Sequence, residues 1–201
     1  MQMQATVRPD TVEELEQKVA YAEQVKLIIN RIHSAKDIDH ILVDLKDEIL
    51  KILDAEVLTL YVIDAERREI YSKYLDIDKM HEIRVPISEQ SISGFVAKYR
   101  RPVNIADAYN KAELNAISPS LTFDSSWDKK SGFRTKQILT YPIVADNKYL
   151  MGVIQLVNKK SGGRFAKKDE ESVAEISKTL GIAFFNQLKL SRKNPTKFDY
   201  L

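Results

Sequence analysis

The chain has 201 residues and no cysteine, which excludes disulfides, thiolate metal sites and cysteine nucleophiles at once. Neither sign of charge is in large excess, because 31 basic residues against 29 acidic ones leave a formal net charge of +2. Such a balance lacks the basic stripe that nucleic-acid phosphates require. The start of the chain lacks the apolar core of a signal peptide, and no apolar run reaches the roughly 18 residues of a membrane span. We therefore expect a cytoplasmic protein that binds no nucleic acid.

Hydrophobic residues make up 44% of the chain and charged residues 30%, the composition of a globular protein with a sizeable core. Glycine is scarce, with six in all. The segment Ser161-Gly162-Gly163 has no Walker lysine beside it, so it predicts a turn and not a phosphate-binding loop.

Two segments predict long amphipathic helices. The first runs from Thr11 to Ile32, begins with a capping box formed by Thr11 and Glu14, and carries apolar residues at heptad spacing. These are Val12, Leu15, Val19, Ala22 and Ile29. The second runs from about Lys167 to Arg192, and its apolar heptad positions are Val173, Ile176, Leu180, Ala183 and Leu190. Since this helix is apolar on other faces too, we expect it to cover a sheet and to meet the first helix of the same or another subunit, most simply in a homodimer.

Between these helices the hydrophobic period changes to that of strands. Three short runs between Ala55 and Pro86 predict antiparallel strands, and residues 135–145 and 149–160 predict a hairpin. The last strand is apolar on both faces. The terminal helices can cover one face, and the polar segment 91–134, which we call the lid, must cover the other. The sequence therefore predicts an α+β fold, with a central antiparallel sheet and a lid over a ligand pocket.

Polar residues at this predicted pocket leave two interpretations open. Gln155 stands alone among valines on one strand face, either as a ligand contact or as a hydrogen-bonding partner of the lid backbone. Near the end of the lid stand several short side chains that can donate or accept hydrogen bonds and would suit a small polar ligand. Such residues also serve as ordinary turn and capping residues. They are Asp124, Ser125, Asp128, Ser131 and Thr135.

The most specific motif combines Asn158-Lys159, Phe165 and Asp169-Glu170. It resembles the signature of GAF domains in cyclic-nucleotide phosphodiesterases and related cyclases. The segments SISGFVA, PVNIADAY, SGFRTKQIL and MGVIQLVNKK extend this resemblance over residues 35–192. Lys159 leaves the last strand and Asp169 stands in the first turn of the closing helix, so we expect an ion pair that holds helix to sheet. We interpret these five signature residues as structural.

The resemblance also implies a set of ligand-binding positions, from the base to the phosphate of a nucleotide. They are Thr59, Tyr74, Ile105, Ala106, Asp128, Ser131, Thr135 and Gln155. One departure is Asp124, which follows Phe123 at a place where relatives that bind cyclic GMP carry an aromatic residue. A carboxylate there repels a phosphate unless Lys129 or Lys130 compensates its charge.

The resemblance implies a regulatory domain and not an enzyme. Without cysteine, the chain cannot be a GAF-type methionine sulfoxide reductase or carry a covalently attached bilin. None of the three histidines stands in a nucleophile context. His81 is either a haem ligand or, as we favour, an ordinary strand-edge residue. We expect no catalytic residue, no metal and no covalent cofactor.

Two functions from different classes remain. The first is a sensory module that binds cyclic AMP or cyclic GMP and signals through dimeric helices to a fused output domain. The second is a ligand-free dimerisation scaffold, such as the N-terminal part of a secretion or pilus-assembly ATPase. In both, residues 1–34 form a dimerisation and signalling helix, residues 35–192 the GAF domain, and residues 193–201 a linker or the start of a following domain.

Overall fold

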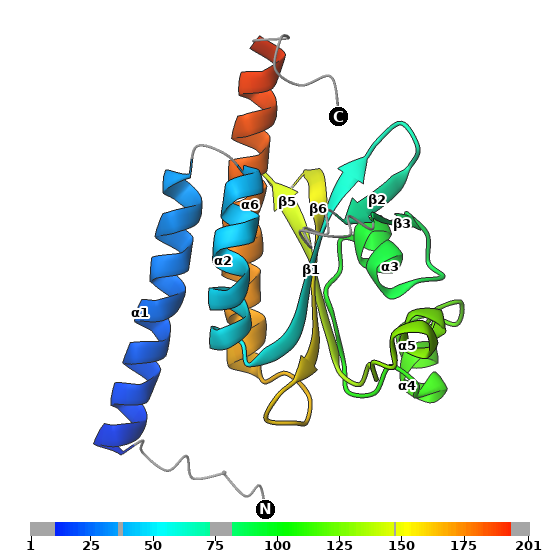
Figure 1. Cartoon of the computed structure of the whole chain (residues 1–201), viewed down its shortest axis with the longest axis horizontal. Coiled ribbons are helices and arrows are strands. Elements are labelled where there is room, and N and C mark those ends of the chain that lie inside the picture. Colours follow the sequence, from blue (N-terminus) through cyan, green and yellow to red (C-terminus); the bar gives the residue numbers. More distant parts are fainter. Residues whose placement is uncertain (1–10, 36–37, 73–81, 147, 194–201) are drawn as a thin grey trace, which may run out of the picture.

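The computed structural model describes residues 11–35, 38–72, 82–146 and 148–193, with side chains except at 38–43 and 191–193. The elements form three layers, with one group of helices on each side of a central sheet (Figure 1). One side carries α1 (Val12–Ser34), α2 (Ile38–Ile52) and α6 (Lys167–Lys193). The other carries the lid helices α3 (Ile92–Tyr99), α4 (Lys111–Ile117) and α5 (Ser126–Ser131). The predicted α+β architecture, with the terminal helices on one face of the sheet, is confirmed.

The sheet has six strands in the order β3-β2-β1-β6-β5-β4, and every neighbouring pair is antiparallel. The strands are β1 (Ala55–Asp64), β2 (Glu69–Ser72), β3 (Ile83–Pro86), β4 (Val103–Ile105), β5 (Ile138–Ala145) and β6 (Tyr149–Lys159). The three strands predicted between Ala55 and Pro86 and the predicted hairpin are thus confirmed. The lid contributes the edge strand β4 as well as its three helices.

Two apolar cores fill the space on either side of the sheet, because successive residues of a strand face opposite layers. The core on the side of the terminal helices includes Ile28, Leu45, Leu139, Ile154, Ile176 and Leu180. The core on the lid side includes Tyr61, Phe95, Ile105, Leu121, Ile138 and Val153. The lid therefore has an apolar base of its own.

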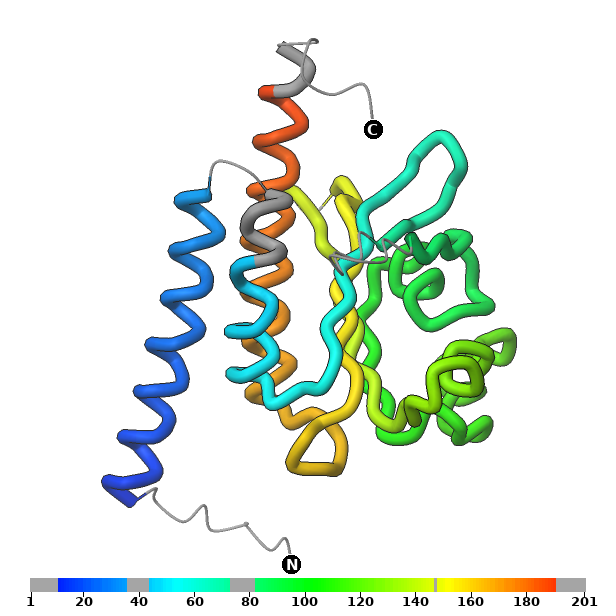
Figure 2. The backbone as a smooth tube through the Cα atoms, in the orientation of Figure 1, coloured from blue at the N-terminus to red at the C-terminus, as the bar shows by residue number. Residues whose placement is uncertain are grey.

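The first helix begins as its sequence predicts. Thr11 Oγ1 accepts a hydrogen bond from the Glu14 backbone N–H at 3.2 Å, and Glu14 Oε2 accepts one from Thr11 N–H at 2.7 Å. In Figure 2, α1 and α6 lie side by side and run in the same direction. The first helix thus packs against the last helix of the same chain. Within the described residues, no helix is both long and apolar enough to cross a membrane.

The residues that α1 buries differ from the predicted heptad positions. The buried residues are Val25, Ile28 and Ile32, whereas Val12, Leu15 and Val19 are 73%, 49% and 58% exposed. Within the chain, α1 therefore packs through a neighbouring apolar stripe, and the predicted seam is exposed at these three positions. The helix carries two apolar stripes, and the shape of the neighbouring α2 and α6 selects the one that lies closer to its C-terminal end.

Candidate functional site

The end of β6 holds the sheet to α6. Lys159 Nζ lies 2.8 Å from Asp169 Oδ2 and also donates to the Leu53 backbone carbonyl at 3.0 Å. The structure thus contains the ion pair that the signature led us to expect. Asp169 is fully buried, and its Oδ2 also accepts a hydrogen bond from the Ala166 N–H at 2.7 Å. Phe165 is buried beside the ammonium group, 5.6 Å from its ring centroid. Since a buried charge must be paired, this contact fixes the start of α6.

Another signature residue, Asn158, makes its contacts away from α6. Its side chain is buried, and its amide contacts β1 and the segment that leads into β5. Glu170, the last residue of the signature, accepts a hydrogen bond from the Asn104 amide, and so joins α6 to β4.

Two of the predicted ligand-binding residues, Asp128 in the lid and Thr135 just after it, bind each other. The Asp128 carboxylate accepts hydrogen bonds from the N–H and the hydroxyl of Thr135, both at 2.8 Å. Both side chains are buried. A third hydrogen bond to this carboxylate comes from the Tyr109 hydroxyl, also at 2.8 Å. The group of Asp128, Thr135 and Tyr109, which we call the lid latch, holds α5 against the start of β5 and the segment before α4.

Tyr109 was not among the predicted site residues, although it ends the PVNIADAY segment. Its ring packs edge-on against Phe123 at 5.1 Å, and the Arg134 guanidinium lies over it at 3.5 Å from the centroid. Desolvation, together with the Asp128 carboxylate, raises the pKa of Tyr109, so it remains a hydrogen-bond donor at neutral pH. Only the tertiary structure reveals this role, because Asp128 lies 19 positions after Tyr109 and 7 positions before Thr135.

The remaining polar residues of α5 serve the helix itself. Ser131 is exposed, and its hydroxyl donates to the Trp127 carbonyl at 2.7 Å and accepts from the Phe133 N–H at 3.2 Å. Asp124 accepts hydrogen bonds from the N–H and hydroxyl of Ser126, which lower the pKa of its carboxyl group. The structure therefore places Ser131 apart from the lid latch and gives Asp124 a local partner at the start of α5.

A polar row crosses the lid-side face of the sheet. Gln155 in β6 stands directly opposite Thr59 in β1 and Thr140 in β5, at the centre of an otherwise apolar surface. The Tyr61 hydroxyl donates to Gln155 Oε1 at 3.4 Å, so the contact of this amide comes from the sheet and not from the lid backbone. Thr140 is fully buried, and its hydroxyl has no hydrogen-bond partner. Thr140 was not among the predicted site residues. The register of the predicted hairpin could have identified it, because that register pairs Thr140 with Gln155.

The other predicted positions have varied surroundings. Ile105 is fully buried in the core on the lid side. The Ala106 N–H donates to the Glu113 carboxylate at 2.8 Å, and is thus bound within the lid. Tyr74 and His81 lie outside the described residues. Among the described residues, no group of three or more histidine, aspartate or glutamate side chains is arranged to hold a metal ion.

The structure thus brings four of the predicted positions into two groups, Thr59 and Gln155 in the polar row on the sheet and Asp128 and Thr135 in the lid latch. The row offers hydroxyls that can donate or accept and an amide that can do both. The lid latch closes α5 through a buried carboxylate. Such a pair of surfaces can bind a small molecule that carries hydrogen-bonding groups on an otherwise flat, apolar body.

Two curated proteins that are similar to part of this chain are named as phosphodiesterases. No family model matches the chain. A probable 3′,5′-cyclic phosphodiesterase of Caenorhabditis elegans is 29% identical over 75% of this chain, and a dual 3′,5′-cyclic-AMP and -GMP phosphodiesterase of Takifugu rubripes is 29% identical over 67%. The chain spans 21% and 15% of the lengths of these two proteins. The match therefore concerns a small part of each relative.

Solved structures match the whole fold. The GAF domain of an Acinetobacter phosphoenolpyruvate-protein phosphotransferase superposes with a TM-score of 0.66 at 14% identity, over 86% of this chain and 98% of that one. A free methionine-R-sulfoxide reductase of Neisseria meningitidis gives a TM-score of 0.63 at 15% identity, over 94% and 99%. The chain therefore has the fold of a GAF domain, and the resemblance found in its sequence is confirmed.

Proposed function

We propose that this chain is a sensory module that binds a cyclic nucleotide, cyclic AMP or cyclic GMP, between the sheet and the lid. The observation that carries the proposal is the polar row of Thr59, Gln155 and Thr140. A buried hydroxyl without a partner, such as that of Thr140, costs folding free energy unless something else satisfies it. A purine edge offers donors and acceptors side by side, and could bond with the hydroxyls and the amide together.

In this proposal the lid residues contact the part of the ligand that faces away from the sheet. Ile105 and Ala106 flank the base and the phosphate, and Asp128 and Thr135 hold α5 closed over them. Ser131 would reach the ligand only after α5 turns. Tyr74 is proposed as the residue that stacks on the base. The ligand acts by favouring the closed lid, with no catalytic step, metal or covalent cofactor.

Two curated relatives support the ligand class, since one is named as a probable 3′,5′-cyclic phosphodiesterase and the other as a dual 3′,5′-cyclic-AMP and -GMP phosphodiesterase. Because the chain matches only 15–21% of their lengths, we propose that it regulates an output domain fused to it. In this proposal the protein is cytoplasmic and signals through α1 and α6.

Thermal unfolding with each nucleotide in excess tests the ligand. At about 100 times its dissociation constant, a ligand stabilises the native state by roughly 2.7 kcal/mol. For a domain of this size that is a rise in Tm of roughly 5–10 °C. We expect such a rise with one of the two nucleotides. If neither shifts the Tm, the cyclic-nucleotide proposal is wrong.

Two variants that each remove one buried hydroxyl test whether the ligand binds at the polar row. Thr140→Val removes a hydroxyl that has no partner in the protein, so the free protein should unfold at an unchanged or slightly higher temperature while the ligand-induced shift shrinks. Ser177→Ala also removes a buried hydroxyl without a partner, but in α6 on the opposite layer, and should keep the full shift. Equal shifts in both variants would exclude the polar row as the binding surface.

The exposed stripe on α1 favours a second function, dimerisation, which is compatible with the first. Val12, Leu15 and Val19 lie on one face of the helix and are exposed, as a surface that meets a second copy of the chain would be. We propose a homodimer through this stripe. Without ligand binding, the same interface would make the chain a dimerisation scaffold.

A further inference from the structure

On the way from the lid into β5, the backbone on both sides of Thr135 is bound by one side chain, that of Asn158. Asn158 Nδ2 donates to the Arg134 carbonyl at 2.9 Å, and Asn158 Oδ1 accepts from the Lys136 N–H at 2.7 Å. The residue between these two contacts is Thr135, which donates its N–H and its hydroxyl to Asp128. One amide thus fixes the backbone on both sides of the residue that docks α5.

The chemistry of this position suits asparagine. Its φ of 57° lies in the left-handed region, which asparagine tolerates better than most other residues with a side chain. An amide has both a donor and an acceptor, and the two lid contacts need one of each. The same Nδ2 also donates to Glu56 Oε2 in β1 at 2.7 Å, and the side chain is only 4% exposed. The amide therefore ties the base of the lid to the centre of the sheet.

The next residue along β6 is Lys159, whose ammonium group is paired with Asp169 in α6. Two adjacent residues at one strand end thus hold the closing helix and the base of the lid. We propose that Asn158 is a positioning residue, which sets how firmly α5 docks through the lid latch and couples that docking to the strand end where α6 is anchored. The proposal concerns the protein without ligand, and so stands apart from the identity of any nucleotide.

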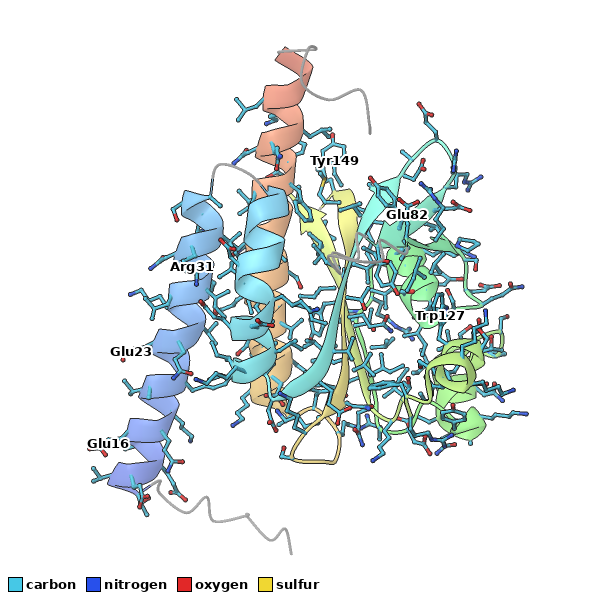
Figure 3. The ribbon with its side chains drawn as sticks, in the orientation of Figure 1. Glu16, Glu23, Arg31, Glu82, Trp127 and Tyr149 are labelled. Carbon is cyan, nitrogen blue, oxygen red and sulfur yellow. The ribbon has the colours of Figure 1, made fainter. Side chains whose placement is uncertain are left out.

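Hydrogen exchange of Asn158→Gly tests the proposal. Glycine adopts the positive φ without strain, so the backbone of β6 is retained while the amide is lost. We expect amides of residues 126–136 to exchange roughly tenfold faster, the equivalent of about 1.4 kcal/mol, with little change elsewhere in the sheet. Trp127, the only tryptophan of the chain, lies in α5 on the lid side of the sheet (Figure 3), and acrylamide should quench its fluorescence more strongly in this variant.

Asp146→Gly is the matched control. Asp146 also has a positive φ, of 49°, is exposed, and stands at the far end of the same hairpin. This variant should leave exchange in residues 126–136 unchanged. The proposal is overturned if Asn158→Gly does not accelerate exchange there, if it accelerates exchange equally throughout the sheet, or if the Asp146 variant has the same local effect.

A second variant tests whether Asn158 acts through the lid latch. Thr135→Val removes the hydroxyl that donates to Asp128 and should loosen α5 by itself. If Asn158 works by positioning Thr135, the double variant should exchange less rapidly than the product of the two single effects implies. Fully multiplicative effects would show that the two residues act independently, and would contradict the proposal.

Discussion

Tyr61, in β1, has a pKa that differs from that of an exposed tyrosine. Tyr61 is buried beneath the lid, and desolvation raises its pKa to about 12, although the neighbouring Ser93 hydroxyl partly offsets the effect. Its phenol therefore stays protonated at neutral pH and donates to Gln155. This contact joins the Gln155 amide to β1.

The raised pKa of Tyr61 predicts a dependence of stability on alkaline pH. The unfolded chain loses the phenol proton near pH 10, whereas the folded protein keeps it until about pH 12. Because the folded state then binds more protons, this contribution is fully present below pH 10 and is lost as the pH rises from 10 to 12, by up to about 2.7 kcal/mol. Urea unfolding at pH 8, 10 and 11 measures it.

Tyr61→Phe serves as the reference, because other tyrosines and lysines titrate in the same range. The variant should lose less stability than the wild-type protein between pH 8 and 11. Equal losses in the two proteins would contradict the assignment of this titration to Tyr61.

At the scale of elements, the contact of α6 with β5 depends on a residue without a side chain. A Cβ at Gly181 would lie 2.4 Å from the Val144 carbonyl oxygen and 2.7 Å from its carbon. Glycine lowers the stability of a helix interior by about 1 kcal/mol relative to alanine. The presence of glycine here indicates that close packing of α6 against β5 stabilises the fold by more than this cost.

Gly181→Ala is therefore expected to lower the free energy of unfolding, although it raises helix propensity. Overpacking against backbone costs roughly 1–3 kcal/mol. Chemical denaturation measures this loss, and Lys178→Ala, at an exposed position one turn earlier, should change stability by no more than about 0.5 kcal/mol. A Gly181→Ala protein as stable as the wild type would mean that α6 can move away from β5 without penalty.

At the scale of the whole molecule, α1 has one apolar stripe packed against the chain and one exposed. The heptad that contains Val12, Leu15 and Val19 places Lys18 at a g position and Glu23 at an e position. In a parallel pair of helices these positions face each other with opposite charges. Figure 3 shows Glu23 on the side of α1 away from the sheet. The charge pattern thus supports association of two copies through α1.

Sedimentation over a range of concentrations tests this association. The wild-type protein should form a dimer, and Val19→Glu should shift it to monomer, because the carboxylate would be buried in an apolar interface. Gln24→Glu adds the same charge at an exposed position outside the stripe and should leave the dimer intact. A monomeric wild-type protein, or equal effects of the two variants, would contradict the dimer.

The pattern of apolar residues predicts the two terminal helices, most of the strands and the order of the layers. Strict periods of two and of about 3.6 residues distinguish strands from helices, the capping box of Thr11 and Glu14 starts α1, and the signature placed Lys159 opposite Asp169. These features are predictable because each depends on residues close in the chain or on a motif of fixed spacing.

Which surfaces contact each other is visible only in the folded chain. In α1, Val25, Ile28 and Ile32 are buried, whereas three of the predicted heptad positions, Val12, Leu15 and Val19, are exposed. The fold also brings Tyr109 to Asp128, and sets Thr140 beside Gln155 across a strand pair. A helix with two apolar stripes has no local preference for either, and contacts between distant residues depend on register and packing. These contacts depend on the free energy of the whole folded molecule, which cannot be predicted from the pattern of neighbouring residues.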